Sequence, residues 1–526
     1  MRLSAIGKHP AVRRTTDWVM KIGPITGLVV VLSYIAAQQA VSPHRRMIKL
    51  AVLLALMSLI LRFDMVYSVY LFTLLYPFPS GVSVGSTNSI LMSVIPLIWA
   101  VRAASTKSKL FLQKSRLDIP IVLFLFAHVL SFYNVETSKE LAESLRIMWR
   151  TVASIMYFYM IVTFVNDEKK VILLTKVACG ICAMVMVTAV IELFFPGAAI
   201  IPGWIGLASN VGEGKFGYRI EGVRVGGAFG SHGMLSDFGT QMFFLMVYHV
   251  VRSRNPIEKA IWAAATLLTV AAVVATANRG AFVAFVVGIG YFLYLFRGRL
   301  SVTRLAIVAA TIAGLFVAAE MVLTRYTYAV SLSDRLTATS FEGVVPETRT
   351  MTWKPALAKS LDHPFIGHGP YYDVGVGLTK QFWPHNAFIF YMYTIGVLGL
   401  LAYLAIVFRV WQYSKSYLIP ETRGTPLNDI SRILRVILTV FLIEQLRTDH
   451  QRDDIYPYIM WMVFGLVTAT ALVMREKYQG GQTGESGLWR TNGRPGPPGR
   501  QGGPNGPSAS RPDGRPKGRP DGRLLT

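Results

Sequence analysis

Four arginines in the central part of the chain have the chemistry of a site for a polyanion. Arg219 and Arg224 lie in a glycine-rich segment, Arg279 stands between two apolar runs, and Arg349 lies in a long polar segment. A guanidinium can donate two parallel, charge-assisted hydrogen bonds to a phosphate. An isolated arginine at a membrane boundary can equally be an anchor whose head reaches water. As a set, the four arginines predict an anion site if folding brings them to one face.

His385 is the candidate general base. It follows Pro384 and precedes Asn386, at the start of an apolar run. Proline pre-sets a turn, and Asn386 can either cap the following helix or hold the imidazole. A histidine at such a helix mouth titrates near neutral pH and can take a proton; an interfacial histidine with a structural hydrogen bond is the plainer alternative. His363 and His368 lie beside glycines and a proline, so we interpret them as turn residues.

Two acidic residues are close to these cations in the sequence. Asp237 and Glu192 lie within or near apolar runs. Ionisable groups in such runs are costly unless they have a partner. Each is therefore expected either to orient an arginine or to make a structural hydrogen bond.

The composition shows what kind of protein must position these residues. Of 526 residues, 52% are hydrophobic and only 16% charged, with a mean hydropathy of +0.43. Soluble domains have about 25% charged residues. The net charge of +24 would suggest nucleic acid in a soluble protein, but most of the lysines and arginines lie in short segments between apolar runs. That arrangement is typical of membrane proteins, and no nucleic-acid partner is expected.

Apolar runs of about 16 to 25 residues follow one another through most of the chain, each long enough or nearly long enough to cross the hydrocarbon as a helix. They predict an all-α, polytopic bundle of about 12–14 transmembrane helices over residues 18–474, embedded in the lipid bilayer. The candidate spans are 18–40, 47–61, 63–79, 86–101, 118–133, 146–165, 171–195, 233–251, 257–277, 280–296, 303–323, 386–411, 428–444 and 455–474.

The distribution of lysine and arginine predicts the orientation of the chain, because such residues stay cytoplasmic in short loops. Both termini are expected in the cytoplasm, with 1–17 as the N-terminal segment, and two long loops, 196–232 and 324–385, outside. The basic stretch at 44–46 runs against this pattern. Residues 475–526 are rich in Gly, Pro and Arg, so they predict a disordered cytoplasmic tail.

With these loops in place, residues 191–404 resemble the superfamily of bacterial O-antigen ligases and O-antigen polymerases. The resemblance rests on four short blocks in the order of the family. It departs from the family at Asn278, where serine is frequent, and at Ser231-His232-Gly233, where an Asn-Pro-like step is frequent. The four blocks are 224–230, 276–282, 349–369 and 385–399.

The resemblance implies an enzyme of the bacterial inner membrane. It would move a glycan from undecaprenyl diphosphate to an acceptor hydroxyl, on a second glycan or a lipid core, at the periplasmic face. By this analogy Arg224 and Arg279 bind the diphosphate, Arg349 and Arg219 assist, and His385 with Arg279 acts in catalysis. Other polysaccharide assembly proteins are possible partners.

No cofactor and no metal is expected, because the chain has no Asp-x-Asp pair of the kind that holds a divalent cation in many nucleotide-sugar transferases. Several alternatives stay open at this point. If the protein is an enzyme of this kind, it is either a ligase or a polymerase. A transporter or flippase of lipid-linked glycan is the alternative function, although no internal repeat supports it. An assembly scaffold that recruits partners through its tail is the third reading.

Overall fold

The structure is a computed structural model that describes residues 64–479. The predicted spans 18–40 and 47–61, the N-terminal segment and nearly all of the predicted tail lie outside the described residues. The gaps within the described range are 79–80, 83–84, 107–111, 195–198, 202–204, 207–209, 214–218, 299–301, 328–329, 338–340, 343–344 and 373–383.

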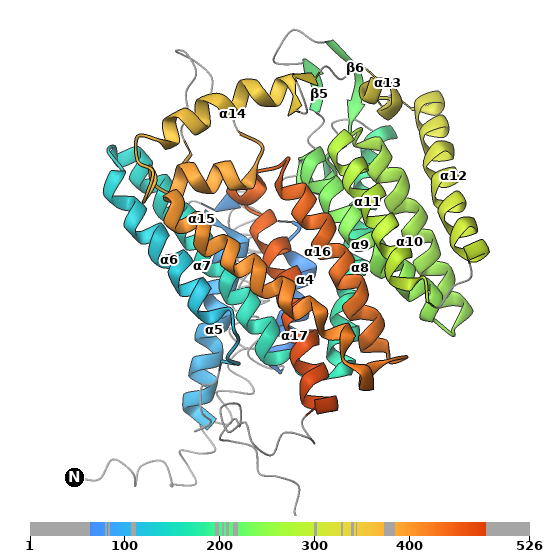
Figure 1. The fold of residues 1–526 in the computed structure, drawn as a ribbon, viewed down its shortest axis with the longest axis horizontal. Helices are drawn as coiled ribbons and strands as arrows, with labels where there is room; N and C mark the ends of the chain where they lie inside the picture. The colour runs from blue at the N-terminus through green and yellow to red at the C-terminus, as the bar shows by residue number, and fades with distance from the viewer. Residues whose placement is uncertain are drawn as a thin grey trace, which may run out of the picture. The chain divides into compact units, whose positions relative to one another are not determined.

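Fourteen α-helices make up most of the described chain (Figure 1). They are α4 (Met65–Leu75), α5 (Thr87–Thr106), α6 (Asp118–Ser131), α7 (Ser138–Phe164), α8 (Glu168–Phe194), α9 (His232–Arg252), α10 (Pro256–Ala275), α11 (Arg279–Phe296), α12 (Val302–Tyr326), α13 (Leu332–Thr337), α14 (Glu347–Ser360), α15 (Ala387–Tyr413), α16 (Pro426–Gln445) and α17 (Tyr456–Gln479).

The strands are short and form four separate antiparallel hairpins. They are β1–β2 (Gly81–Val82, Gly85–Ser86), β3–β4 (Ala199–Ile201, Ile205–Gly206), β5–β6 (Asn210–Glu213, Arg219–Arg224) and β7–β8 (Phe341–Glu342, Val345–Pro346). None of these pairs continues into a larger sheet among the described residues. The predicted all-α class is therefore confirmed.

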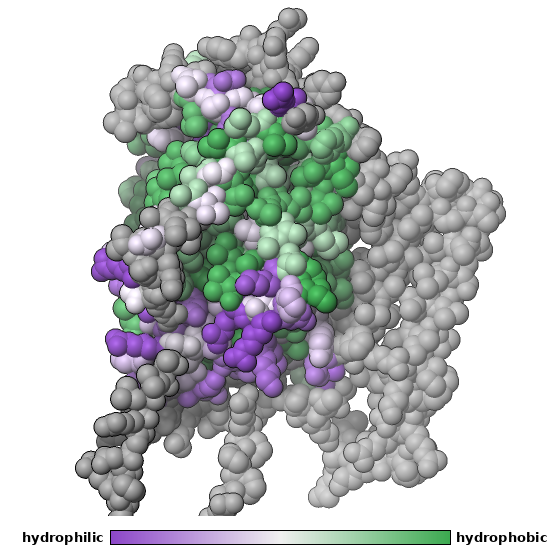
Figure 2. Space-filling model, turned by 90° about the vertical axis from the view of Figure 1, so that its right-hand side faces the viewer, coloured by the Kyte–Doolittle hydropathy of each residue, from purple (hydrophilic) through white to green (hydrophobic). Residues whose placement is uncertain are grey.

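The helices have the character of a membrane bundle. Every predicted span from 63–79 onward overlaps a helix. Six helical segments of the described chain are long and apolar enough to cross a bilayer: α7, α8, α10, α11, α17 and the stretch Ala387–Leu418. On the side of α10 to α12, a wide apolar band separates a hydrophilic region at the lower end from a smaller one at the upper end (Figure 2). Such a band is the surface that lipid covers.

Helix α17 lies at the centre of the bundle. Within its most apolar window, 94% of the residues are buried, which is typical of a helix that is hydrophobic all round. It packs mainly against α7 and α16, while α6 packs on α15, α9 on α10 and α11 on α16. Aromatic rings fill the contact between α4, α7 and α17: Phe72, Tyr157 and Tyr458 meet edge to face, with centroids 4.7 and 5.2 Å from that of Phe72.

Helix α15 is broken at Gly396, where φ is +66° and ψ −172°. Segment 364–369 from the second long loop fills the break. Val397 N donates to Pro364 O (2.8 Å), and His368 N donates to Tyr393 O (2.9 Å). A Cβ at Gly396 would overlap the carbonyl of Phe365. The break therefore leaves these backbone groups paired, as irregular backbone inside a membrane protein must, and it ties the second loop to α15.

One end of the bundle collects the features that the sequence singled out. Helices α9, α11 and α15 begin there, α16 ends there, and α13, α14 and the β5–β6 hairpin lie over that end (top of Figure 1). Because backbone N–H groups at helix N-termini carry partial positive charge, three N-termini at one end favour an anion.

Candidate active site

Two helices begin at the site with the same local motif. Ala277 and His385 have φ of 46° and 48°, and they are the non-glycine residues of the described chain with positive φ. Each is followed by an asparagine whose side chain caps the helix: Asn278 accepts from Ala281 N, and Asn386 from Phe388 N and Ile389 N. Left-handed backbone costs energy in a non-glycine residue and gathers at functional sites. This motif places Arg279 and His385 at their helix mouths.

Arg224 is positioned by the loop before α9. Buried Glu192 on α8 accepts hydrogen bonds from Gly226 N (2.9 Å) and Gly227 N (2.7 Å), which fixes the chain directly after the arginine. Arg224 Nε donates to Thr276 O at the end of α10 (3.0 Å). Arg224 therefore lies beside the turn that leads to Arg279.

Arg279 and Arg335 hold α11 and α13 together. Arg279 Nη1 donates to the carbonyl of Arg335 (3.1 Å), and Arg335 Nη1 donates to the carbonyl of Ala277 (2.8 Å). Both side chains are half-buried. This reciprocal pair brings a third guanidinium, from the second long loop, next to Arg224 and Arg279.

Helix α14 adds Arg349. Arg349 and Trp353 are one helical turn apart and so lie on the same face. Trp353 Nε1 donates to the carbonyl of Pro384 (2.6 Å), directly before His385. The electrostatic partners of Arg349 are Asp449, Arg447 and Arg279, so α14 places Arg349 in the same cluster.

The cluster is strongly positive. Burial, together with the nearby charges of Arg335 and Arg279, lowers the pKa of Arg224 to about 9. Burial and Arg279 lower the pKa of Arg335 to about 10. Burial is also the main reason why the pKa of Arg349 falls to about 10, although Asp449 acts in the opposite direction. All three guanidinium groups remain charged at neutral pH, and their mutual repulsion is relieved when an anion binds.

His385 is paired with Asp449, in the short loop between α16 and α17. Asp449 Oδ2 accepts from His385 N (3.2 Å), and Oδ1 lies 3.5 Å from His385 Nδ1. The imidazole is 39% exposed, whereas Asp449 is fully buried. A carboxylate beside Nδ1 favours a proton on that nitrogen, so that Nε2 can accept one, which is the logic of a catalytic triad. His232 lies within electrostatic reach of His385, Arg224 and Arg335, so histidine and arginines share one site.

Beneath the site, Arg447 joins three helices. Its guanidinium forms a short ion pair with buried Asp237 on α9 and donates to Asn278 Oδ1 (3.2 Å), the cap of α11. Glu444 on α16 lies 3.9 Å from the same guanidinium. A Cβ at Gly280 would overlap Arg447 Cδ, so glycine is needed for the arginine to cross α11 here. Arg447 therefore holds Asn278, the residue directly before Arg279, against Asp237 on α9.

The structure thus brings together Arg224, Arg279, Arg349 and His385 from the sequence-based set. Arg219 opens β6 opposite Glu213, and a role for its side chain stays a prediction. Asn386 acts as the helix cap. Asp237 pairs with an arginine, Arg447, which was not among the four predicted arginines. Glu192 instead accepts structural hydrogen bonds from Gly226 N and Gly227 N.

Three residues of the cluster were missed by the analysis of the sequence: Arg335, Arg447 and Asp449. A signal for the last two is present, because Arg447, Asp449 and His450 crowd the short loop between two apolar spans, on the side predicted for the long loops. Arg335 lies in a polar segment, and no motif in the sequence distinguishes it from its neighbours. Among the described residues, no group of three or more His, Cys, Asp or Glu side chains is arranged to hold a metal ion.

The fold and site define a multi-span membrane protein with a cationic, histidine-bearing site at one end of its helical bundle. Residues 264–404 match the family model described as O-antigen ligase, so this region of the chain is similar to that family. The match spans α11 to α14 and most of α10 and α15, which carry Arg279, Arg335, Arg349 and His385. A search of curated proteins found no match. The family implies a glycosyl-transfer enzyme that acts on lipid-linked glycans in a bacterial membrane.

Proposed function

We propose that the protein is a metal-independent, inverting glycosyltransferase. It takes a glycan from a polyprenyl diphosphate and joins it to an acceptor hydroxyl at the extracytoplasmic face of the bacterial inner membrane. The observation that carries this proposal is the meeting of Arg224, Arg279 and His385, from three separate stretches of chain, at one end of the bundle.

In the proposed reaction, the arginine cluster binds the diphosphate and His385 Nε2 takes the proton of the acceptor hydroxyl. The acceptor oxygen forms a bond to the anomeric carbon of the donor sugar from the face opposite the diphosphate. The bond between that carbon and the phosphate oxygen breaks, and its electron pair stays on the leaving diphosphate. Fixed guanidinium groups stabilise this developing charge without reorganisation. Asp449 stabilises the imidazolium that forms.

The donor supplies the energy of the reaction in this proposal. The extracytoplasmic compartment has no ATP, so an activated leaving group must arrive with the glycan. The distribution of Lys and Arg in short loops supports an orientation with the site outside and both termini in the cytoplasm.

A defined transfer assay tests the proposal. The protein is purified in detergent and mixed with a polyprenyl-diphosphate-linked glycan and an acceptor. Transfer in the absence of a sealed membrane is expected of an enzyme and not of a flippase. Arg224→Ala, Arg279→Ala and His385→Ala are each expected to lower the rate by about 10²- to 10³-fold. If all three folded variants transferred glycan at the wild-type rate, the proposed site would be wrong.

The same variants in cells separate the two possible activities. If the protein is a ligase, the variants accumulate lipid-linked polymer that is not attached to its acceptor. If it is a polymerase, the ladder of surface glycan stops at one repeat unit. A gel of surface and lipid-linked polysaccharide distinguishes these outcomes.

A further inference from the structure

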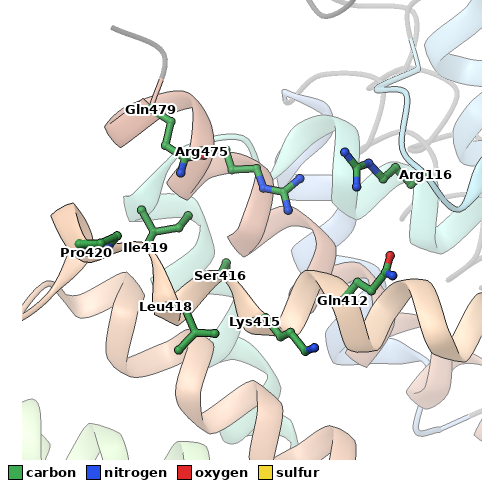
Figure 3. A pocket seen from close by; sticks show the side chains of 9 residues that line it. All are labelled: Arg116, Gln412, Lys415, Ser416, Leu418, Ile419, Pro420, Arg475 and Gln479. Atoms are coloured by element: carbon green, nitrogen blue, oxygen red, sulfur yellow. The ribbon is translucent and has the colours of Figure 1, made fainter. Parts of the chain in front are cut away.

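The end of the bundle opposite the arginine cluster carries a cavity lined by cations. Helices α15 and α17 both begin at or near the cluster, so their C-terminal ends lie at the other end of the bundle. There, the last residues of the two helices, the segment 415–420 that follows α15 and the segment before α6 line a cavity of about 500 Å³ (Figure 3). The reaction proposed above makes no use of it.

Three cations face this cavity, one from each wall: Arg116, Lys415 and Arg475. Figure 3 shows Arg116 and Arg475 extending toward one another across it, with Lys415 below. None of the nine residues that line the cavity is acidic, and no carboxylate of the described chain forms an ion pair with any of the three cations. The cavity therefore has a charge excess that an anion would neutralise.

The two arginines are held in place through one side chain. The backbone N–H of Arg116 donates to the hydroxyl of Tyr413 (3.0 Å), and the guanidinium of Arg475 lies 5.3 Å from the centre of the same ring. Tyr413 itself is buried. Tyr413 therefore anchors the backbone of Arg116 and packs against the guanidinium of Arg475, so both arginines are tied to α15.

The rest of the wall is amphipathic. Gln412 and Ser416 add uncharged hydrogen-bonding groups, whereas Leu418, Ile419 and Pro420 form an apolar side. Leu418 is 61% exposed. A phosphate beside an apolar edge is the arrangement of a phospholipid headgroup, whose phosphodiester meets cations while its acyl chains run along the helices.

We propose that this cavity binds the phosphodiester of an anionic phospholipid such as phosphatidylglycerol. Lipids with a choline group are disfavoured, because their ammonium would enter a site that already holds three cations. The chain's own segment 480–526 is not a suitable occupant, since it carries eight Lys and Arg residues against three Asp and Glu. Placing this lipid in the cytoplasmic leaflet rests on the orientation proposed above; the binding itself does not.

A binding titration tests the proposal on the full-length protein in neutral detergent. Short-chain phosphatidylglycerol, phosphatidylcholine and inorganic phosphate are added separately, and bound ligand is counted by native mass spectrometry. Phosphatidylglycerol is expected to bind, and phosphatidylcholine and inorganic phosphate at least tenfold more weakly. Arg116→Gln and Arg475→Gln should each weaken phosphatidylglycerol binding by about tenfold, as expected for the loss of one charge-assisted hydrogen bond.

Three further variants make the result decisive. Arg423→Gln removes an exposed cation that does not line the cavity, and it should bind phosphatidylglycerol as the wild type does. Arg116→Lys keeps the charge and should retain most of the binding. Arg279→Ala should bind the lipid normally even though it loses glycan transfer, which separates this proposal from the proposed function. Unchanged lipid binding in Arg116→Gln and Arg475→Gln would overturn the proposal, as would inorganic phosphate binding with equal affinity at the same residues.

Discussion

Asp449 contacts His385 at two points, the backbone N–H and Nδ1 of the imidazole, although 64 residues separate them in the chain. The carboxylate is fully buried and the imidazole is partly exposed. The pair therefore has one rigid member and one member that faces the site. Because His385 also has a left-handed backbone conformation, Asp449 helps to hold both its backbone and its ring.

Replacing this carboxylate tests its role in the proposed reaction. Asp449→Asn keeps the size of the side chain but removes the charge that stabilises an imidazolium. The rate of glycan transfer is expected to fall by about 10²-fold or more, with little change in the affinity for the donor. The measurement is kcat and KM in the transfer assay. A variant that loses donor affinity but keeps kcat would contradict a role through His385.

Gly280 provides a test of Arg447. In Gly280→Ala, the new Cβ overlaps Arg447 Cδ, so the arginine must leave the cap of α11 and Asn278 loses a partner. We expect transfer to fall by about tenfold, which corresponds to about 1.4 kcal/mol in the barrier. Gly290→Ala in the same helix is the matched control, since no atom lies within 4 Å of the added Cβ. Equal activity of the two variants would show that Arg447 does not position Arg279.

Glu192 tests how Arg224 is positioned. Glu192→Leu leaves the N–H groups of Gly226 and Gly227 without their acceptor, at a cost of about 1–3 kcal/mol for each buried group. We expect lower stability and weaker donor binding, because the loop after Arg224 is released. Glu192→Gln keeps an acceptor oxygen and should be close to the wild type. Melting temperature and KM for the donor are the two measurements, and the interpretation fails if the two variants behave alike.

The repulsion within the arginine cluster predicts that an anion stabilises the protein. The pKa values of Arg224, Arg335 and Arg349 are lowered, so at neutral pH each charge is disfavoured in the empty site and favoured once a diphosphate binds. A short-chain isoprenyl diphosphate should raise the melting temperature, by an amount that grows with its concentration as ligand linkage requires. Arg335→Ala should reduce this shift.

The control for this experiment is Arg252→Ala, which removes an exposed arginine at the C-terminal end of α9, away from His232. Its shift should equal that of the wild type. A shift that is the same in Arg335→Ala and in the wild type would remove Arg335 from the diphosphate site.

A chelator tests whether arginine alone carries the charge of the leaving group. Because the cluster supplies guanidinium groups where other transferases use a divalent cation, transfer should continue at the wild-type rate in excess EDTA. The rates with and without EDTA are compared on the same preparation. A loss of activity that Mg²⁺ restores would contradict the metal-independent reaction.

Much of the fold follows from local sequence. Every span that apolar runs predicted from 63–79 onward overlaps a helix. Such runs can be found in the sequence because their length and period are local properties. The role of Asn386 as a helix cap was among the predicted alternatives for the same reason. The arginines and His385 were identified as a set because their residue types fit phosphate and proton transfer.

What the tertiary structure alone decided is which distant residues meet. Asp237 and Arg447 are 210 residues apart, and Arg335 reaches Ala277 across 58 residues. The break in α15 likewise depends on segment 364–369, which supplies the partners of the freed backbone groups. No periodicity or spacing within the chain encodes such contacts, because they arise from the packing of whole helices against one another. The sequence by itself determined the helices and the chemistry available to them, and helix packing decided that this chemistry gathers at one end of the bundle.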